Sequence, residues 1–357
     1  MTTTTSTPAS TTRRSTRNVA SRTSLARWLP IAAMVVFMFV LGAYTNSKNS
    51  AFTSTFTLNG MFVATMPLAF AAMGQASALM VRAFDVSVGA LMTVCVVVAS
   101  FVITPDQPWW SLGLGMLLVV AVALATGAVN VGLIRGLKLS SIIATLATLS
   151  ILQGIALRMR PQAAGPINSD FVDFLLASWG FMPIAFLVIV GIAVVADIWL
   201  YRTAGGLAAR AAGLDEVSAE RRGVRVSYLF TRAFFISAFA AAIGSFLLAA
   251  QVEIGDPTIG LSYTLTSIAA AVLGGASLLG GRGSFIGAVV GALFLTLIIT
   301  VLPYLGWSAP YGRIAVGVLT LVALTFYQAP ALLVRMKTFF ANVRLSRSRS
   351  TALADEA

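Results

Sequence analysis

The sequence of 357 residues contains no histidine, a single cysteine and few charged residues, which make up 10% of the chain. Without histidine it cannot build a Ser–His–Asp or Cys–His nucleophilic centre. Cys95 has no partner for a disulfide, and the groups that usually bind transition metals are missing. We therefore expect a protein that is not an enzyme and that binds no metal and no other cofactor.

Lysine is scarce as well, and none of Lys48, Lys138 and Lys337 follows a glycine. A phosphate-binding loop of the G-x-x-x-x-G-K-[ST] type needs a lysine directly after a glycine. Energy for any transport must therefore come from another chain or from an ion gradient.

Apolar residues are abundant, at 58% of the chain, with a mean hydropathy of +0.90. A charged side chain in the middle of a bilayer is costly, and a spanning helix needs about 20 apolar residues. These features predict an all-α, polytopic integral membrane protein with about ten transmembrane helices. The apolar runs lie at 28–43, 59–81, 86–104, 111–134, 140–157, 181–200, 230–251, 264–280, 284–302 and 311–329.

The basic residues indicate how these spans are oriented. If both termini are cytoplasmic, 20 of the 24 Lys and Arg residues fall on the inner side, as the positive-inside rule requires. The net charge of +12 is thus explained by membrane topology, and we do not expect a nucleic-acid partner.

The domain organisation follows from the same pattern. Residues 1–27 are rich in Ser, Thr and Arg and are expected to form a disordered cytoplasmic tail. Residues 28–329 form the transmembrane domain, with one long cytoplasmic loop at about 201–229, and residues 330–357 form a cytoplasmic C-terminal tail.

The long loop contains the sequence AGLDEVSAERRGV at 212–224, which predicts one short charged helix bounded by glycines. Asp215 and Glu216 would lie in its first turn and Arg221 and Arg222 in its last, as the helix dipole favours. Such a helix is suited to a groove on a soluble partner, although a solvated connector would look similar. The residues expected to carry this coupling role are Gly213, Asp215, Glu216, Ser218, Ala219 and Gly223.

Glycines concentrate in a second segment, where 280–283 (GGRG) predict a tight inner turn between two spans. The Gly-x-x-x-Gly spacing is typical of closely packed membrane helices, although glycine is common in any membrane helix. The predicted packing residues are Gly274, Gly275, Gly280, Gly281, Gly287 and Gly291.

Polar residues inside the spans are mostly uncharged and could line a path for a neutral polar solute. Hydroxyl groups also bond to their own helix backbone, and Asp85 and Ser87 could simply cap a helix. The candidates for the pathway or its gating are Asp85, Ser87, Asn130, Thr145, Thr148, Gln153, Thr266 and Ser267.

Four stretches in this order resemble the permease subunits of bacterial ATP-binding-cassette importers of the ribose, xylose and galactose class. They are FDVSVG at 84–89, SSIIATLATL at 140–149, the 212–224 loop, and IAAAVLGGASLLGGRGS at 268–284. The chain departs from the usual family motif in each of the first three stretches, for example with Asp215 where asparagine is usual. These differences leave the class intact.

The resemblance implies a multi-pass protein of the bacterial inner membrane that provides the pathway for a monosaccharide. Its implied partners are a second permease copy, two cytoplasmic ATPase subunits that grip the 213–223 helix, and an extracytoplasmic solute-binding protein. Nucleosides and branched-chain amino acids remain alternative solutes. An ion-coupled secondary transporter, in which Asp85 or Asp197 would titrate, remains an alternative mechanism.

Overall fold

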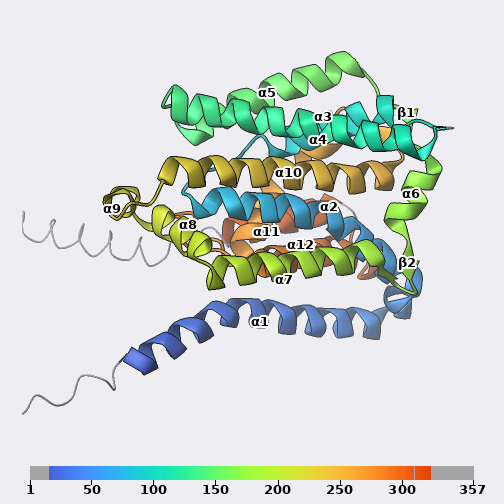
Figure 1. Ribbon diagram of the computed structural model, residues 1–357. Helices are drawn as coiled ribbons and strands as arrows, with labels where there is room; N and C mark the ends of the chain where they lie inside the picture. The colour runs from blue at the N-terminus through green and yellow to red at the C-terminus, as the bar shows by residue number, and fades with distance from the viewer. Residues whose placement is uncertain (1–15, 106, 309, 323–357) are drawn as a thin grey trace, which may run out of the picture.

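The computed structural model describes residues 16–105, 107–308 and 310–322, and most of this part is α-helical (Figure 1). Within these ranges, seven helices are long and apolar enough to cross a membrane. Their bounds are α1 (Thr16–Lys48), α2 (Thr55–Met80), α4 (Trp109–Val131), α5 (Ser141–Met159), α7 (Ile184–Arg202), α10 (Val226–Val252) and α12 (Phe285–Tyr304). The all-α, polytopic fold predicted from hydropathy is thereby confirmed.

Three further apolar helices are shorter, namely α3 (Val88–Val102), α11 (Tyr263–Leu273) and Pro310–Val322. Each of the ten predicted spans therefore contains a helix. The count of ten membrane crossings stays a prediction, because these three fall below the usual spanning length. The span expected at 264–280 is shorter than predicted, since α11 ends at Leu273 and Gly275 and Gly280 adopt positive φ.

Helix α2 lies in the middle of the bundle, between α10 and α7 in Figure 1. Every residue from Thr65 to Met80 is buried, and the helix packs against α10, α11 and α12. Small residues permit this close packing: the Gly74 Cα lies so close to the Ser237 backbone that an added Cβ would be 3.1 Å from it. Helix α1 is peripheral and packs mainly on α12.

At the outer end, short elements that the sequence did not predict tie the helices together. Strand β1 (Ala164–Pro166) pairs antiparallel with β4 (Ile254–Gly255), and β2 (Ser178–Trp179) pairs with β3 (Met182–Pro183). The 3-10 turns η1 (Ser50–Thr53) and η3 (Ile259–Ser262) and helix α6 (Ser169–Leu176) complete this end. The Arg160 guanidinium also donates hydrogen bonds to the hydroxyl and carbonyl oxygens of Ser100.

The predicted cytoplasmic end differs from expectation in two places. The long loop contains two helices, α8 (Ala204–Leu214) and α9 (Glu216–Arg221), separated by Asp215, so the prediction of a single helix over 212–224 is wrong. Helix α1 begins at Thr16, within the segment expected to be a disordered tail. The C-terminal tail at 330–357 lies outside the described residues.

Candidate coupling and translocation site

A chain of buried hydrogen bonds joins five polar side chains near the predicted cytoplasmic end. Asp85, in the loop between α2 and α3, accepts hydrogen bonds on Oδ1 from the Ser87 hydroxyl at 2.6 Å and on Oδ2 from the Ser237 hydroxyl at 2.8 Å. Asn130 on α4 donates to Ser87 Oγ at 2.9 Å and accepts from Thr148 Oγ1 of α5 at 2.7 Å. The network therefore links α3, α4, α5 and α10.

This network also shows what Asp85 and Ser87 do locally. Ser87 occupies the position before α3 but makes no side-chain capping bond. Its hydroxyl donates to Asp85, and its oxygen accepts from Asn130. The Asp85 carboxylate instead accepts the backbone N–H of Ser87 at 3.2 Å. Only 2% of Asp85 is exposed, and a buried carboxylate needs several donors of this kind. The expectation that Ser87 caps the helix is therefore not met.

Helix α5 holds the same loop through its own hydroxyl groups. Thr145 Oγ1 accepts the Val86 N–H at 3.1 Å, and Ser141 Oγ accepts the Phe84 N–H at 3.2 Å. Thr145 is fully buried. Five of the eight residues expected to line the pathway are thus gathered in one place, inside the protein rather than on an open surface.

The other three candidates lie elsewhere. Gln153, towards the outer end of α5, donates to the Pro257 carbonyl at 2.8 Å. The hydroxyls of Thr266 and Ser267 on α11 bond back to the carbonyls of Ser262 and Thr264. The sequence could not distinguish these from the first five, because periodicity does not show which helices meet.

Helix α9 is a short, well-capped element at the cytoplasmic end. Asp215 is its N-cap: Oδ1 accepts the Ser218 N–H at 3.1 Å and Oδ2 accepts the Ser218 hydroxyl at 2.5 Å. The Ser218 hydroxyl and N–H bonds hold the pKa of Asp215 below its usual value. Gly223 ends the element with a φ of +82°, a conformation that favours glycine.

The two faces of this region differ in character. Ala219 is buried in a small apolar cluster with Ala212 of α8 and Leu229 of α10. Leu214 and Val217 are 60% and 58% exposed, although they are apolar. Leu214 ends α8 and Val217 lies in α9, so the pair flanks the Asp215 cap between the two helices. Exposed apolar side chains among charged ones are common where another protein docks.

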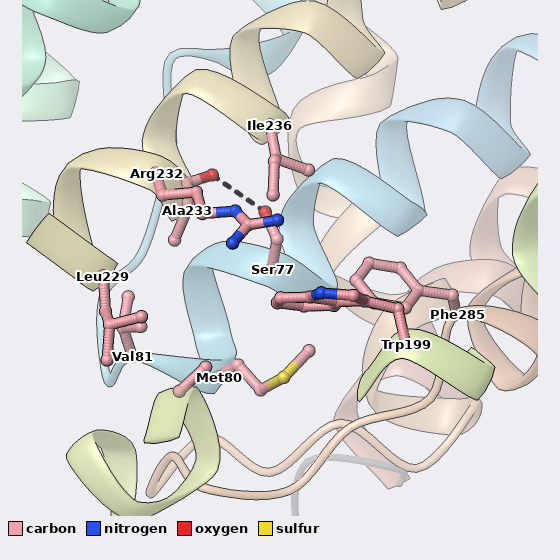
Figure 2. A pocket seen from close by; sticks show the side chains of 10 residues that line it. Ser77, Met80, Val81, Trp199, Leu229, Arg232, Ala233, Ile236 and Phe285 are labelled. Atoms are coloured by element: carbon pink, nitrogen blue, oxygen red, sulfur yellow. Dashed lines mark hydrogen bonds between the residues drawn. The ribbon is translucent and has the colours of Figure 1, made fainter. Parts of the chain in front are cut away.

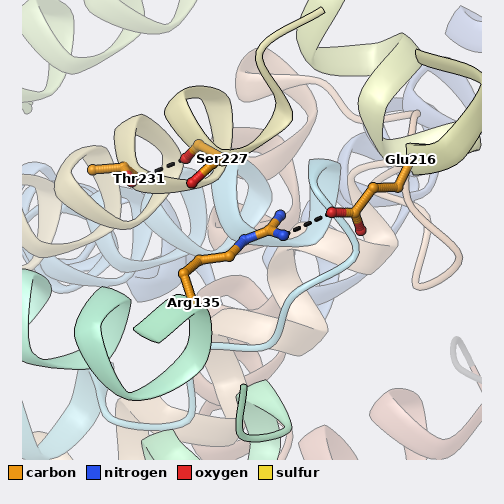
Figure 3. A network of polar contacts seen from close by, with 4 residues as sticks. All are labelled: Arg135, Glu216, Ser227 and Thr231. Carbon is orange, nitrogen blue, oxygen red and sulfur yellow. Dashed lines mark hydrogen bonds and ion pairs between the residues drawn. The ribbon is translucent and has the colours of Figure 1, made fainter. Parts of the chain in front are cut away.

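Arg135 connects α9 to α4. It lies in the π-helical turn Gly132–Gly136 that continues α4, and its Nη1 donates to Glu216 Oε1 at 2.7 Å (Figure 3). Its guanidinium carbon also lies 4.4 Å from the centre of the Phe230 ring of α10. No sequence pattern indicated this role, because a contact between residues 81 positions apart depends on tertiary structure.

Gly213 occupies a second junction, on α8 and not on the coupling helix where it was predicted. It is buried against the Met80 carbonyl at the end of α2 and the Gly281 N–H of the inner turn, and a Cβ would collide with Met80 O. The Gly281 N–H donates to that same carbonyl at 2.9 Å. Gly280 packs against the Gly213 carbonyl and the Arg82 side chain.

The remaining glycines bring α11 and α12 together. Gly274 and Gly287 lie against each other's backbones, and Gly291 lies against the Ala270 carbonyl. At each of these positions a Cβ would overlap a backbone atom of the neighbouring helix. Gly275 is favoured for a different reason: its φ of +99° is a backbone conformation that other residues rarely adopt.

Comparison with known proteins shows which family the chain belongs to. Residues 57–324 match the family described as the permease component of the branched-chain amino acid transport system. The chain belongs to this permease family. The matched region includes the Asp85 network, both junctions of the cytoplasmic loop and the α11–α12 glycines.

Individual relatives agree with the assignment. The permease is 32% identical over 305 residues to the autoinducer 2 import system permease protein LsrC of Enterobacter sp. strain 638, covering 82% of this chain and 85% of the relative. It is 28% identical over 319 residues to the ribose import permease protein RbsC of Haemophilus influenzae, covering 86% and 96%. No solved structure matches the permease at a significant level.

Membership places the permease in the bacterial inner membrane as the non-catalytic transmembrane subunit of an ATP-driven importer. ATP hydrolysis and solute capture belong to separate partner chains. This confirms the expectation drawn from the missing phosphate-binding loop.

Proposed function

We propose that this permease provides the pathway for a monosaccharide or a similarly small polyhydroxylated solute. The observation that carries the proposal is the match to a ribose import permease over 96% of that relative's length. The polar residues that the sequence places within the spans are mostly neutral, and neutral hydroxyl and amide groups can bond such a solute without trapping it.

Two ATPase subunits would grip α9, one on each of two permease copies. The support is the exposed apolar pair Leu214 and Val217 beside the charged residues Glu216 and Arg221. The Asp215 cap keeps this surface helical before a partner arrives, which reduces the ordering cost of docking.

Movement of α9 would then reach the membrane helices by two routes. The Arg135–Glu216 ion pair connects α9 to α4, and Asn130 on the same α4 helix connects to Ser87 and Asp85. The Gly213 junction connects α8 to α2 and to the turn between α11 and α12. Rigid elements joined in this way can transmit a cytoplasmic displacement to the membrane domain.

A second, identical permease copy would complete the pathway, with a solute-binding protein docking on the outer face. Helix α5 supports this assembly, since it packs on α3 and α4 with one side only. Its other side exposes Ile143 and Ile151, at 63% and 62%. Gly154 on that side leaves room for close approach.

Uptake in intact cells tests this function. Expression of the permease with its ATPase and binding-protein partners should give accumulation of a labelled monosaccharide that continues after an ionophore collapses the ion gradients, provided ATP is maintained. Loss of uptake with the gradient would instead indicate the secondary-transport mechanism. Accumulation of only branched-chain amino acids or nucleosides would retain the mechanism and reject the proposed solute.

A further inference from the structure

Two hollows lie on one side of the bundle, between α7 and α10, and we call the strip that contains them the groove. Both helices pack against α2 but hardly touch each other, so that α2 forms the floor between them (Figure 1). A cavity of about 420 Å³ occupies the outer part of this groove, and a narrower pocket occupies its cytoplasmic end.

The outer cavity is lined almost wholly by apolar side chains, including Phe70 of α2, Val188 and Ile192 of α7, and Ile243 and Phe246 of α10. Val188 and Ile192 are 54% and 45% exposed, so the cavity opens to the surroundings of the bundle. Because these helices lie in a bilayer, hydrocarbon surrounds the opening. An apolar space of this kind suits a lipid acyl chain.

The cytoplasmic pocket adds a cation to the same groove. Arg232 of α10 stacks with its guanidinium carbon 4.3 Å from the centre of the Trp199 ring of α7, above an apolar wall that includes Met80 and Phe285 (Figure 2). Among the described residues, no carboxylate lies within ion-pair distance of this guanidinium. Tryptophan and arginine at a helix end are typical of the headgroup depth of a membrane.

We propose that this groove binds one anionic phospholipid of the cytoplasmic leaflet. Its phosphate lies on the Arg232 guanidinium beside Trp199, and one acyl chain follows α2 towards the outer cavity. Residues 232 and 243 are about 16 Å apart along α10, which matches the depth of about 15 Å for one leaflet of hydrocarbon. A chain anchored at Arg232 therefore reaches Ile243, at the nearer edge of the cavity.

The Arg232 guanidinium and the apolar groove each define one part of the ligand. The unpaired guanidinium selects a negatively charged headgroup over a zwitterionic one, as basic pockets between membrane helices do on the cytoplasmic side. The apolar groove requires an acyl chain, which a free phosphate ion lacks.

Native mass spectrometry of the purified permease tests both contributions by titrating phosphatidylglycerol or phosphatidylcholine of equal chain length. We expect preferential binding of one phosphatidylglycerol and about fivefold weaker binding to the Arg232→Gln variant. Arg225→Gln is the matched control, because Arg225 is an exposed arginine at the start of the same helix. Arg232→Lys should retain most of the preference, which also guards against loss of folding in the Gln variant.

The acyl site is tested by filling the outer cavity. Ile192→Trp places a large ring into the nearer part of the cavity lining, about 10 Å along α7 from Trp199, and should weaken binding of phosphatidylglycerol. Gly191→Phe should not, because no atom lies within 4 Å of a Cβ at Gly191. Equal binding of the two lipids, equal losses in Arg232→Gln and Arg225→Gln, or no effect of Ile192→Trp would overturn the proposal. Displacement of the lipid by millimolar inorganic phosphate would assign Arg232 to a free anion and overturn it as well.

Discussion

Gly213 shows how little space separates the cytoplasmic loop from the membrane domain. Its Cα faces the Met80 carbonyl, which already accepts the Gly281 N–H. Any side chain at this position must push α8 away from α2 and from the inner turn. The position was predicted to matter for docking an ATPase, but its environment is a packing contact within the chain.

Gly213→Ala should therefore destabilise the permease by about 1–3 kcal/mol through overpacking and should reduce ATP-driven uptake. Gly191→Ala is the control, since Gly191 is also helical but has open space around it, and alanine favours a helix. Thermal unfolding in detergent measures both variants. Equal melting temperatures for the two would contradict the close contact.

The Asp215 carboxylate caps α9, and this cap depends on the carboxylate being ionised. Bonds from Ser218 lower its pKa, so the cap is complete above the ordinary aspartate value of about 3.9 and is lost as the pH falls through the lowered pKa. We expect the Ser218 amide to stay protected from hydrogen exchange, after correction for intrinsic rates, until the pH falls below that ordinary value.

Asp215→Asn should remove this pH dependence while keeping much of the protection, because asparagine also caps helices well. Asp215→Ala should lose the protection at every pH. Loss of protection in the native chain at a pH well above the ordinary value would show that the cap does not hold the helix.

At the scale of elements, α9 and α4 meet through a pair of charges that are only partly buried. The side chains of Arg135 and Glu216 are 28% and 47% exposed, so their contribution to stability is small, about 0.2–1 kcal/mol. If the pair transmits movement, its loss should lower transport far more than it lowers stability.

Charge reversal separates the effect of the ion pair on transport from its effect on stability. Arg135→Glu or Glu216→Arg alone should uncouple ATP hydrolysis from uptake in proteoliposomes, and the double variant should recover part of the coupling. Glu220→Arg, on the exposed surface of the same helix, should leave the coupling of ATP hydrolysis to uptake nearly unchanged. Additive losses in the double variant would show that the two charges act independently.

Hydropathy located the apolar helices because the cost of burying charge in hydrocarbon acts on every span. It could not locate helix ends that depend on local backbone conformation. Helix α11 stops at Leu273 although the following residues remain apolar, since glycines with positive φ turn the chain there. The break at Asp215 was similarly missed, although aspartate is a preferred N-cap residue.

At the scale of the whole molecule, the charge pattern predicts which end of the bundle is cytoplasmic. The charged loop with α8 and α9 lies at one end of the bundle, and the β1–β4 and β2–β3 pairs lie at the other (Figure 1). The sequence could not predict which helices contact one another. An example is the Asp85 network, which joins α3, α4, α5 and α10. These contacts depend on residues far apart in the chain.

The topology can be measured by cysteine labelling, because the native Cys95 is buried and should not react. Glu220→Cys should react with a membrane-impermeant maleimide only in inverted vesicles, and Ser178→Cys only in intact spheroplasts. Labelling of position 220 from outside would reverse the orientation and remove the basis for ATPase docking at α9.

The pairing of β1 with β4 has a mechanical consequence. Backbone bonds between Ala164 and Gly255, together with the Ile167 N–H to the Glu253 carbonyl at 2.9 Å, fasten the segment after α5 to the segment after α10. Helices α5 and α10 are held together at this end, so they can separate only at the other. We therefore expect the β1–β4 pair to act as a pivot. When α9 moves, α5 and α10 should separate most at their cytoplasmic ends and least at their periplasmic ends.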